Sequence, residues 1–300
     1  MQALFVGQTY IDVTFLADEI PTGDDKMVAR DYAISFGGNA VTAAFACAKL
    51  GIVPDMLTSI ADDWLGRMFI DMAAKYGISV HHRKVRESSL SFIMPHGGKR
   101  AIVRCRDDHY LHPVPPLNIE GARALHLDGH QADAAMHYAK AFRENGILTS
   151  LDGGGLRSNT HELLEFIDVA IVAERLCEQM SLSPTEMLGY LKSRGVKIGG
   201  VTLGEKGLVW YDEKGVESVL PALAVPPEAV IDTNGAGDTF HGAYVYSAMA
   251  RPDLPWRDHF IFARAASAHA IQHLGNEASL PTLDDITVVQ KQYGERKLAA

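Results

Sequence analysis

The chain has 300 residues, 47% of them hydrophobic, and its 28 basic and 37 acidic side chains give a formal net charge of −9. This length and composition suit one large α/β domain with a sizeable core, and they exclude an intrinsically disordered chain. The acidic balance argues against nucleic-acid or membrane-surface binding, because phosphate backbones and anionic lipids repel negative charge.

The first third of the chain predicts a strand, two helices and a hairpin. Ala3–Gly7 is a short apolar run that suits a buried strand. Asn39–Leu50 and Asp63–Tyr76 have helical composition, and each is followed by a glycine that suits a helix C-cap. Leu90–Met94 and Ala101–Cys105 flank a glycine turn, which is typical of a β-hairpin.

The rest of the chain alternates between strands and helices. We expect strands at Ala124–Leu127, Ile147–Leu151, Ile167–Val172, Gly200–Leu203 and Leu208–Tyr211. We expect helices at Asp133–Glu144, Pro184–Ser193, Ala236–Ala250 and Phe260–His273, and one that begins near Leu283. This alternation predicts an α/β fold, with a mostly parallel central sheet covered by helices on both faces.

One early segment differs from the rest. Asp12–Phe36 is polar, contains Pro21 and Gly23, and resembles neither a core strand nor a long helix. Together with the hairpin it is expected to form a small β lid over the edge of the sheet, built from about 12–36 and 88–108. No clear linker or repeat divides the chain, so residues 1–300 are expected to form a single domain.

The strongest chemical signal is the glycine-rich turn Asp-Thr-Asn-Gly-Ala-Gly-Asp at 232–238. It follows the apolar run Ala229–Ile231 and precedes the helix expected from Ala236. A strand, a glycine turn and a helix start in this order present unpaired backbone N–H groups at the positive end of a helix dipole. Glycine also lets a phosphate approach the backbone closely. The turn therefore predicts an anion hole.

Asp238 at the end of this turn has two interpretations. As an N-cap it would only accept amide hydrogen bonds. As a general base it would orient an attacking hydroxyl and take its proton, while the amides stabilise charge on a transferred phosphoryl group. The helix terminus is expected to keep this carboxylate ionised, which makes it a weak base. The turn is neither a P-loop nor a dinucleotide-binding Gly-x-Gly-x-x-Gly motif.

Four segments together resemble the ribokinase (PfkB) family of carbohydrate kinases. The run 232–243 resembles the second family signature, and Phe36–Ala40 with its alanine-rich helix resembles the first. Asp62–Gly66 and Thr202–Gly207 resemble two further segments, in the family's order and spacing. The resemblance implies a ribokinase-like three-layer α/β/α fold with a β lid. It also implies ATP-dependent phosphorylation of a sugar hydroxyl, with Mg²⁺ and a monovalent cation such as K⁺.

The same resemblance implies roles for individual residues. The implied catalytic set is Asp238 as the base, with the anion-hole amides of Gly235, Ala236 and Gly237. The implied substrate contacts are Asp12, Gly38 and Asn39. The implied nucleotide contacts are Thr202, Gly204 and Gly207. The implied monovalent-cation loop is Asp232, Ala270, Gly275 and Ser279.

One segment departs from the family pattern. Many members carry Asn-x-x-Glu after the strand expected here at 167–172, where it helps to organise Mg²⁺ and phosphate. This chain has Ala173 and Leu176 at those two positions, with Glu174 between them. Glu174 is therefore kept as a nucleotide-side candidate, and the mode of Mg²⁺ binding stays open.

Several other polar residues have plain structural alternatives. Asn39 would also suit the N-cap of a helix after a tight glycine turn, and Asp12 would suit an ordinary turn. The thirteen histidines form no convincing helical pair beside a carboxylate. His130 follows a strand at the expected active-site edge, so it is kept as a substrate-binding candidate.

Cationic side chains gather in the expected lid. Lys26 and Arg30 lie at its entry, and Arg104 and Arg106 share one face of the second hairpin strand. Each alone suits a solvated surface, but together they suggest a cationic rim for an anionic sugar, with Lys26 and Arg104 as substrate contacts. The entry segment also resembles that of ketose kinases such as sulfofructose kinase. Arg157, which follows a glycine-rich strand end, is placed to reach a phosphate or carboxylate.

The leading hypothesis is an ATP:sugar phosphotransferase that is a cytoplasmic homodimer without nucleic-acid or membrane partners. The three cysteines lack metal spacing, and the sequence shows neither a signal peptide nor the roughly 18 apolar residues that span a bilayer. One alternative is a nucleoside kinase of the same fold, which needs base stacking on lid residues such as Tyr10, Phe15, Tyr32 and Phe92. The other is a non-catalytic sugar or nucleotide sensor.

Overall fold

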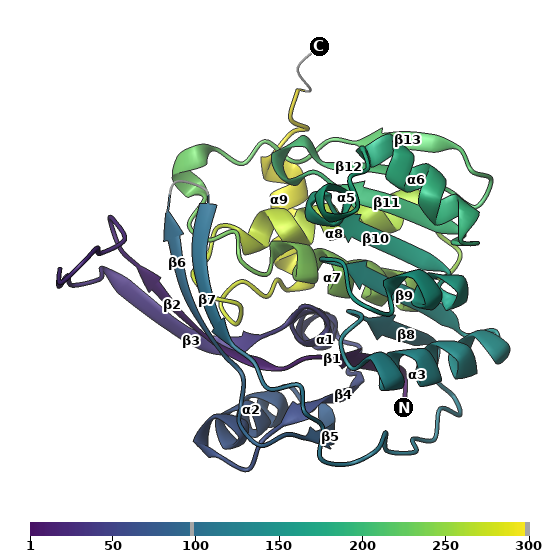
Figure 1. Cartoon of the computed structure of the whole chain (residues 1–300). Coiled ribbons are helices and arrows are strands. Elements are labelled where there is room, and N and C mark those ends of the chain that lie inside the picture. The colour runs from purple at the N-terminus through teal and green to yellow at the C-terminus, as the bar shows by residue number, and fades with distance from the viewer. Residues whose placement is uncertain (97–98, 298–300) are drawn as a thin grey trace.

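The middle layer of the computed structural model is a nine-stranded sheet with the order β13-β12-β11-β10-β9-β8-β1-β4-β5 (Figure 1). The strands from β11 to β5 in this order run parallel, whereas β12 and β13 are antiparallel to their neighbours. The structure describes residues 1–96 and 99–297. The strands are β1 (Ala3–Gly7), β4 (Asp55–Ile60), β5 (Ser79–Lys84), β8 (Ala124–Leu127), β9 (Leu148–Gly153), β10 (Val169–Ala173), β11 (Ile198–Thr202), β12 (Leu208–Tyr211) and β13 (Glu217–Leu220).

Helices cover both faces of this sheet. One face carries α1 (Asn39–Leu50), α2 (Trp64–Lys75), α7 (Ala236–Ala250), α8 (Trp256–Ala270) and α9 (Leu283–Gln292). The other carries α3 (Ala132–Glu144), α4 (Thr160–Leu163), α5 (Glu174–Met180) and α6 (Pro184–Ser193). Because successive strand residues face opposite ways, Phe5 enters the first core while Leu4 and Val6 enter the second. The predicted three-layer α/β/α fold is confirmed.

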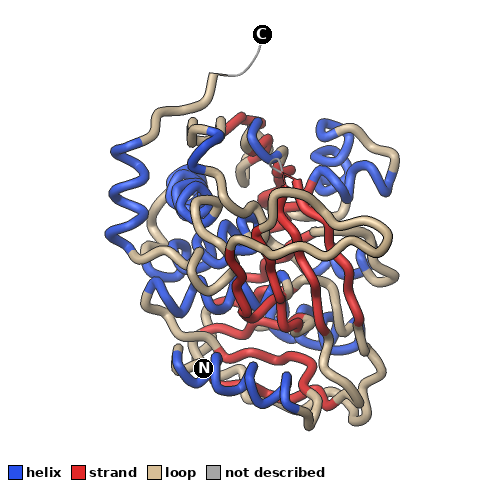
Figure 2. Tube along the Cα trace, turned by 90° about the vertical axis from the view of Figure 1, so that its left-hand side faces the viewer, coloured by secondary structure: helices blue, strands red, loops and turns tan. Residues whose placement is uncertain are grey.

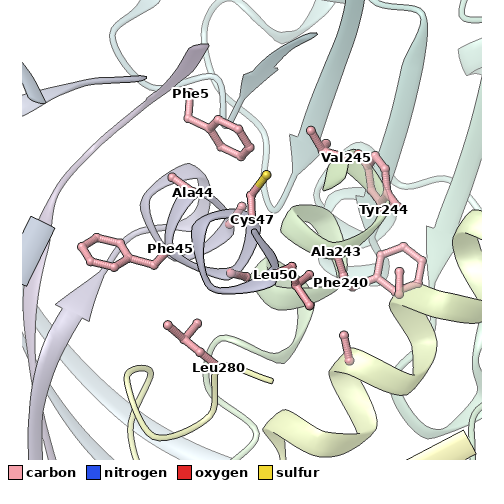
Figure 3. Close-up of a cluster of buried hydrophobic side chains, with 14 of the residues drawn as sticks. Phe5, Ala44, Phe45, Cys47, Leu50, Phe240, Ala243, Tyr244, Val245 and Leu280 are labelled. Carbon is pink, nitrogen blue, oxygen red and sulfur yellow. The ribbon is translucent and has the colours of Figure 1, made fainter. Parts of the chain in front are cut away.

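Close packing of α1 against α7 brings two helix N-termini together. Most of the buried α1 side chains are small, and Ala44 of α1 and Ala243 of α7 lie in the core between these elements (Figure 3). A Cβ atom on Gly242 of α7 would lie 2.2 Å from the carbonyl oxygen of Ala43 in α1. The two backbones therefore touch. At their starts, Gly235 lies beside Thr42, so the first turns of both helices face the same edge of the sheet.

A second, four-stranded sheet with the order β3-β2-β6-β7 stands beside that edge (Figures 1 and 2). Its strands are β2 (Tyr10–Leu16), β3 (Asp31–Gly37), β6 (Leu90–His96) and β7 (Lys99–Cys105). We call this sheet the lid. Its inner face buries polar side chains, including Asp12 and Ser91, whereas its outer face exposes Tyr32, Phe92 and Val103.

The expected elements agree with the structure in most places. The helices predicted at Asn39–Leu50, Pro184–Ser193 and Ala236–Ala250 have the predicted bounds. The helix predicted at Phe260–His273 instead spans Trp256–Ala270, and a turn follows it. The glycines of the predicted hairpin turn lie outside the described residues. In the described part of the chain, no helix is long and apolar enough to cross a membrane.

The segment 12–36, which resembles no core strand, contains most of β2 and most of β3, and both strands lie in the lid and not in the central sheet. In β2 the polar residues Asp12 and Thr14 are buried, while the apolar Val13 and Phe15 are less buried. The alternation with period two is present at 12–15, but it is the polar residues that are buried, so the usual rule assigns the wrong face to the interior. This inversion arises because the inner face of the lid looks onto a polar cleft.

Candidate active site

A cavity of about 1100 Å³ lies between the lid and the carboxyl-end edge of the central sheet. Lid residues such as Leu16 and Arg100 line one side of it, and Thr202, Gly207 and Gly237 line the other. In a parallel sheet, this edge is where ligand-binding loops collect. The volume is large enough for a nucleotide-sized molecule.

The predicted glycine turn forms one end of this cavity. Gly235 has a φ of 71° and is the N-cap of α7, so Ala236, Gly237 and Asp238 occupy the first three helical positions. Their backbone N–H groups have no carbonyl partner within the helix. A Cβ atom on Gly237 would meet nothing within 4 Å, which leaves open space directly above the turn. The arrangement suits an anion at a helix N-terminus.

The structure corrects two expectations about Asp238. It is not an N-cap, because Gly235 occupies that position. Burial, and then the charge of Asp152, raise the pKa of Asp238, although Arg100 and Arg104 oppose the rise. The expectation that the helix terminus keeps this carboxylate strongly ionised is therefore wrong, because lost hydration and a second carboxylate outweigh the helix N-terminus. A raised pKa makes Asp238 a stronger base than expected.

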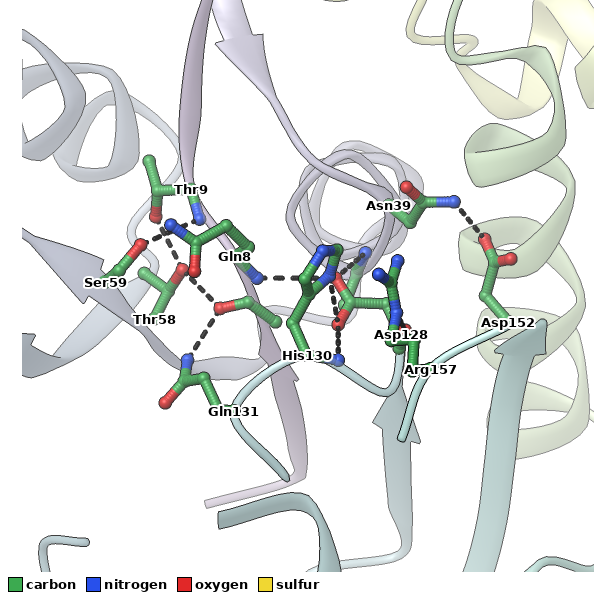
Figure 4. Close-up of polar contacts among 12 residues, drawn as sticks. Gln8, Thr9, Asn39, Thr58, Ser59, Asp128, His130, Gln131, Asp152 and Arg157 are labelled. Atoms are coloured by element: carbon green, nitrogen blue, oxygen red, sulfur yellow. Dashed lines mark hydrogen bonds and ion pairs between the residues drawn. The ribbon is translucent and has the colours of Figure 1, made fainter. Parts of the chain in front are cut away.

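Asp152, which the sequence did not single out as a site residue, is the partner of Asp238. Burial raises its pKa too, while a hydrogen bond from Asn39 opposes the rise. The Nδ2 atom of Asn39 donates to Oδ2 of Asp152 over 3.1 Å (Figure 4). The Nε2 atom of His241 lies 3.7 Å from the same oxygen. Asn39 is therefore a side-chain donor inside the cleft, and the helix cap is Gly38.

A second polar cluster follows β8. Burial alone would raise the pKa of Asp128, but His130 and Arg157 lower it to about 2. The Nδ1 atom of His130 lies 3.1 Å from Oδ1 of Asp128, and Nε of Arg157 donates to the Asp128 carbonyl oxygen over 2.9 Å (Figure 4). The backbone N–H of Ala40 donates to the other carboxylate oxygen over 3.3 Å. The structure thus places His130 and Arg157 beside the start of α1.

Asp12 reaches the cleft from the lid. Its Oδ2 atom accepts hydrogen bonds from the side-chain amides of Asn234 and Asn276, over 3.2 and 3.1 Å. Its Oδ1 atom is buried and has no hydrogen-bond partner in the described part of the chain. An unpartnered buried carboxylate oxygen needs a donor, and a substrate hydroxyl would supply one. Sequence reasoning missed Asn276, because it lies in an irregular segment without a motif.

The cationic side chains of the lid differ in what they contact. The guanidinium of Arg104 lies 5.0 Å from the ring centre of Tyr10, on the inner face. Nη1 of Arg100 donates to the Thr233 hydroxyl over 3.2 Å. Two other cations expected in the rim are already paired, because Arg30 forms an ion pair with Asp18 and Arg106 forms one with Asp108. Lys26 has no charge partner among the described residues, but it is exposed. Fewer lid cations are therefore available to a substrate than expected.

The residues expected near a nucleotide lie at the far end of the cavity. Thr202, Gly204 and Gly207 all line it, in the loop between β11 and β12. Glu174 is exposed at the first position of α5 and does not line the cavity. It follows β10, next to β11, so it stands at the same sheet edge.

The residues expected to form a monovalent-cation loop lie in segments that meet at Asp232. Asp232 accepts the backbone N–H groups of Asn234 and Gly275, over 2.8 and 3.3 Å. Ser279 follows in the same segment, and its N–H donates to the Gly275 carbonyl oxygen over 3.3 Å. Ala270 ends α8, and its carbonyl oxygen accepts from the N–H of His273. Within residues 1–96 and 99–297, no three His, Cys, Asp or Glu side chains form a metal-binding group.

This fold and cleft define a lidded three-layer α/β/α enzyme of the group-transfer type. The sequence matches the model of the pfkB family carbohydrate kinases over residues 2–283, so the chain belongs to that family and is a kinase.

Individual relatives have low sequence identity, but the matches extend over more than nine-tenths of both chains. The chain is 23% identical to a ribokinase of Lactococcus lactis, over 96% of both chains. It is 22% identical to a nucleoside kinase of Methanothermobacter thermautotrophicus, over 93% of this chain and 92% of the relative. The structure of Arabidopsis thaliana ribokinase complexed with ribose and ATP has a TM-score of 0.76 and 23% identity, over 97% of this chain and 98% of that one.

Proposed function

We propose that this protein transfers the γ-phosphoryl group of ATP to a hydroxyl of a sugar, with Asp238 as the general base. The observation that carries the proposal is the junction at Gly237. There the long cavity that passes Gly204 and Gly207 meets the N-terminus of α7, and Asp238 follows at the next position. A nucleotide in the cavity would present its terminal phosphate to the free amides, next to a base.

The cleft beyond this junction supports a sugar acceptor over a nucleoside. Phe15, Tyr32 and Phe92 pack on one another on the outer face of the lid, so they do not face the cleft. Of the four aromatic candidates, Tyr10 alone lies on the inner face, where Arg104 already covers its ring. The lid therefore offers few aromatic rings on which a nucleobase could stack. The candidate acceptor contacts are mostly polar: Asp12, Gly38, Asn39, Arg104 and His130. Lys26 remains a candidate only if the exposed 18–28 segment moves inward.

Mg²⁺ belongs to the proposal as the ion that accompanies ATP. Magnesium sites in kinases use one or two carboxylates plus substrate phosphates, so a complete protein cage is not required. Glu174, Asp152 and Asp238 are all carboxylates at this edge, and we propose that Glu174 and Asp238 would approach it. For K⁺ we propose the loop of Asp232, Ala270, Gly275 and Ser279, where backbone carbonyls would supply most ligands. Both oxygens of Asp232 already accept amides, which leaves them less free to bind a cation.

The proposal includes a cytoplasmic homodimer that buries the outer face of the lid. Tyr32 and Val103 on this face are 63% and 67% exposed, next to Ile34 and Phe92. An apolar sheet face of this kind is usually covered by a partner. The free thiols of Cys47, Cys105 and Cys177 agree with a reducing compartment.

A test of the function is ADP release over a panel of sugars, ketoses, sugar acids and nucleosides. We expect a sugar to be phosphorylated and Asp238→Asn to lower kcat by at least about 100-fold, because the base is lost. The matched control is Asp258→Asn, an exposed aspartate at the start of α8 that should leave kcat unchanged. Nucleotide binding without turnover of any acceptor would favour the sensor instead. Near wild-type kcat in Asp238→Asn would refute the assignment of the base.

A further inference from the structure

We propose that Arg100 of the lid is a catalytic residue that binds the phosphoryl group during its transfer. The inference rests on the proposed function and adds one catalytic residue to it. No motif pointed to Arg100, which lies near the start of the short strand β7. The structure brings it from the lid to the glycine turn at the start of α7.

The geometry places Arg100 on the correct face and at the correct end of the cleft. Arg100 and Arg104 lie an even number of residues apart in β7, so their side chains leave the same face of the lid. Nη1 of Arg100 donates to Oγ1 of Thr233 over 3.2 Å. Thr233 belongs to the turn that ends in the free amides of α7. Arg100 also lines the cavity together with Ala236 and Gly237.

The guanidinium has donors to spare at this position. It carries five N–H donors, and the described contacts use one of them, on Thr233. No carboxylate of the described chain forms an ion pair with Arg100, whereas Arg30, which lines the same cavity from the lid, pairs with Asp18 at 3.0 Å. An exposed arginine held beside an anion hole, with its remaining donors free, suits the oxygens of a phosphoryl group.

The chemistry assigns a separate task to each group. Asp238 takes the proton of the acceptor hydroxyl while that oxygen bonds to the γ-phosphorus. The bond from the γ-phosphorus to the bridging oxygen breaks, and its electron pair leaves on ADP. The proton on Asp238 passes to solvent after product release. Arg100 would neutralise charge on the non-bridging oxygens of the phosphoryl group from the lid side, opposite the α7 amides, which act from the sheet side.

Arg104 has a different position and does not compete for this role. Its guanidinium lies over Tyr10, and it acts electrostatically on Asp12 as well as on Asp238. That places it toward the acceptor. Arg100 acts electrostatically on Asp238 and on Asp232, the first residue of the glycine turn. The two arginines thus stand at the acceptor side and the phosphoryl side of the same lid face.

The test compares Arg100→Gln and Arg100→Lys with the control Arg257→Gln, at an exposed arginine near the start of α8 that does not line the cavity. We expect Arg100→Gln to lower kcat by about 100-fold or more while the KM for ATP changes only a few-fold, since the contact is made mainly in the transition state. Arg100→Lys should recover part of the loss, because it restores charge without the planar fork. Arg257→Gln should stay within about 3-fold of the wild type.

A binding measurement separates this role from a merely structural one. Calorimetry should show that aluminium fluoride strengthens binding of Mg²⁺-ADP, in the presence of the sugar that the ADP-release panel identifies, in the wild type and in Arg257→Gln, and that this gain is lost in Arg100→Gln. Unchanged kcat in Arg100→Gln, or an unchanged fluoride gain, would overturn the inference. Failure of the proposed function gives a different pattern, in which the wild type itself turns over no acceptor or Asp238→Asn keeps its turnover.

Discussion

Alanine substitution should lower the stability of the protein at Gly235 and raise it at Gly237, two residues further along the same turn. Gly235 has a φ of 71°, and a Cβ atom there would lie 2.3 Å from Oδ1 of Asn276. Gly237 lies inside α7, and a Cβ atom there would meet nothing within 4 Å. The same substitution therefore tests backbone strain and crowding at one position and helix propensity at the other.

The expected magnitudes follow from these contacts. Gly235→Ala places a side chain in the left-handed region, which costs about 1 kcal/mol, and it must also displace Asn276. That amide donates to Asp12 and to the Phe36 carbonyl oxygen, so losing it adds about 1 to 2 kcal/mol. Gly237→Ala should instead stabilise the protein by about 0.5 kcal/mol, because alanine is the better helix former.

The activities should both fall, but through different constants. Displacing Asn276 releases Asp12, so Gly235→Ala should raise the KM for the acceptor. A methyl group on Gly237 fills the open space where the phosphate approaches the backbone, so Gly237→Ala should lower kcat or raise the KM for ATP.

Thermal unfolding and steady-state kinetics of the two purified variants measure these effects. An unfolding midpoint for Gly235→Ala equal to or above that of Gly237→Ala would refute the strain argument. Full activity of Gly237→Ala would refute the placement of the phosphate.

Three further predictions test the site and its surroundings. Asp152→Asn removes a negative charge that raises the pKa of Asp238, so the acid limb of kcat/KM should move to lower pH. A uniform loss of rate at every pH would contradict this. The pKa of Asp128 is lowered from 3.8 to about 2, so its contribution to stability is present above 3.8 and is lost as the pH falls toward 2. His130→Asn should make urea-unfolding free energies differ less between about pH 5 and about pH 3, and an unchanged difference would contradict it. Val103→Glu should give a monomer by light scattering, and a monomeric wild type would remove the proposed interface.

Local signals were sufficient to predict the glycine turn and several helices. The order of strand, glycine turn and helix at 229–250 involves only neighbouring residues, so it can be seen in the sequence. Gly51 ends α1 in the left-handed conformation, which is why the end of that helix was predictable. The features that were missed depend on residues far apart in the chain. Asp152 meets Asp238, Asn276 meets Asp12, and Arg100 meets Thr233 only after folding.

The raised pKa of Asp238 links this distant pairing to the chemistry of the site. A helix N-terminus favours a carboxylate, and a second buried carboxylate opposes it. At Asp238 burial is the largest cause of the raised pKa, and the charge of Asp152 adds to it. Closure of the lid over an acceptor would bring Arg100 and Arg104 toward the pair, and both already lower the pKa of Asp238. The base would then be ionised most readily when the lid cations lie closest to it, because the negative charge of the phosphoryl group acts in the opposite direction. Coupling deprotonation to closure in this way would limit transfer to water while the cleft is open.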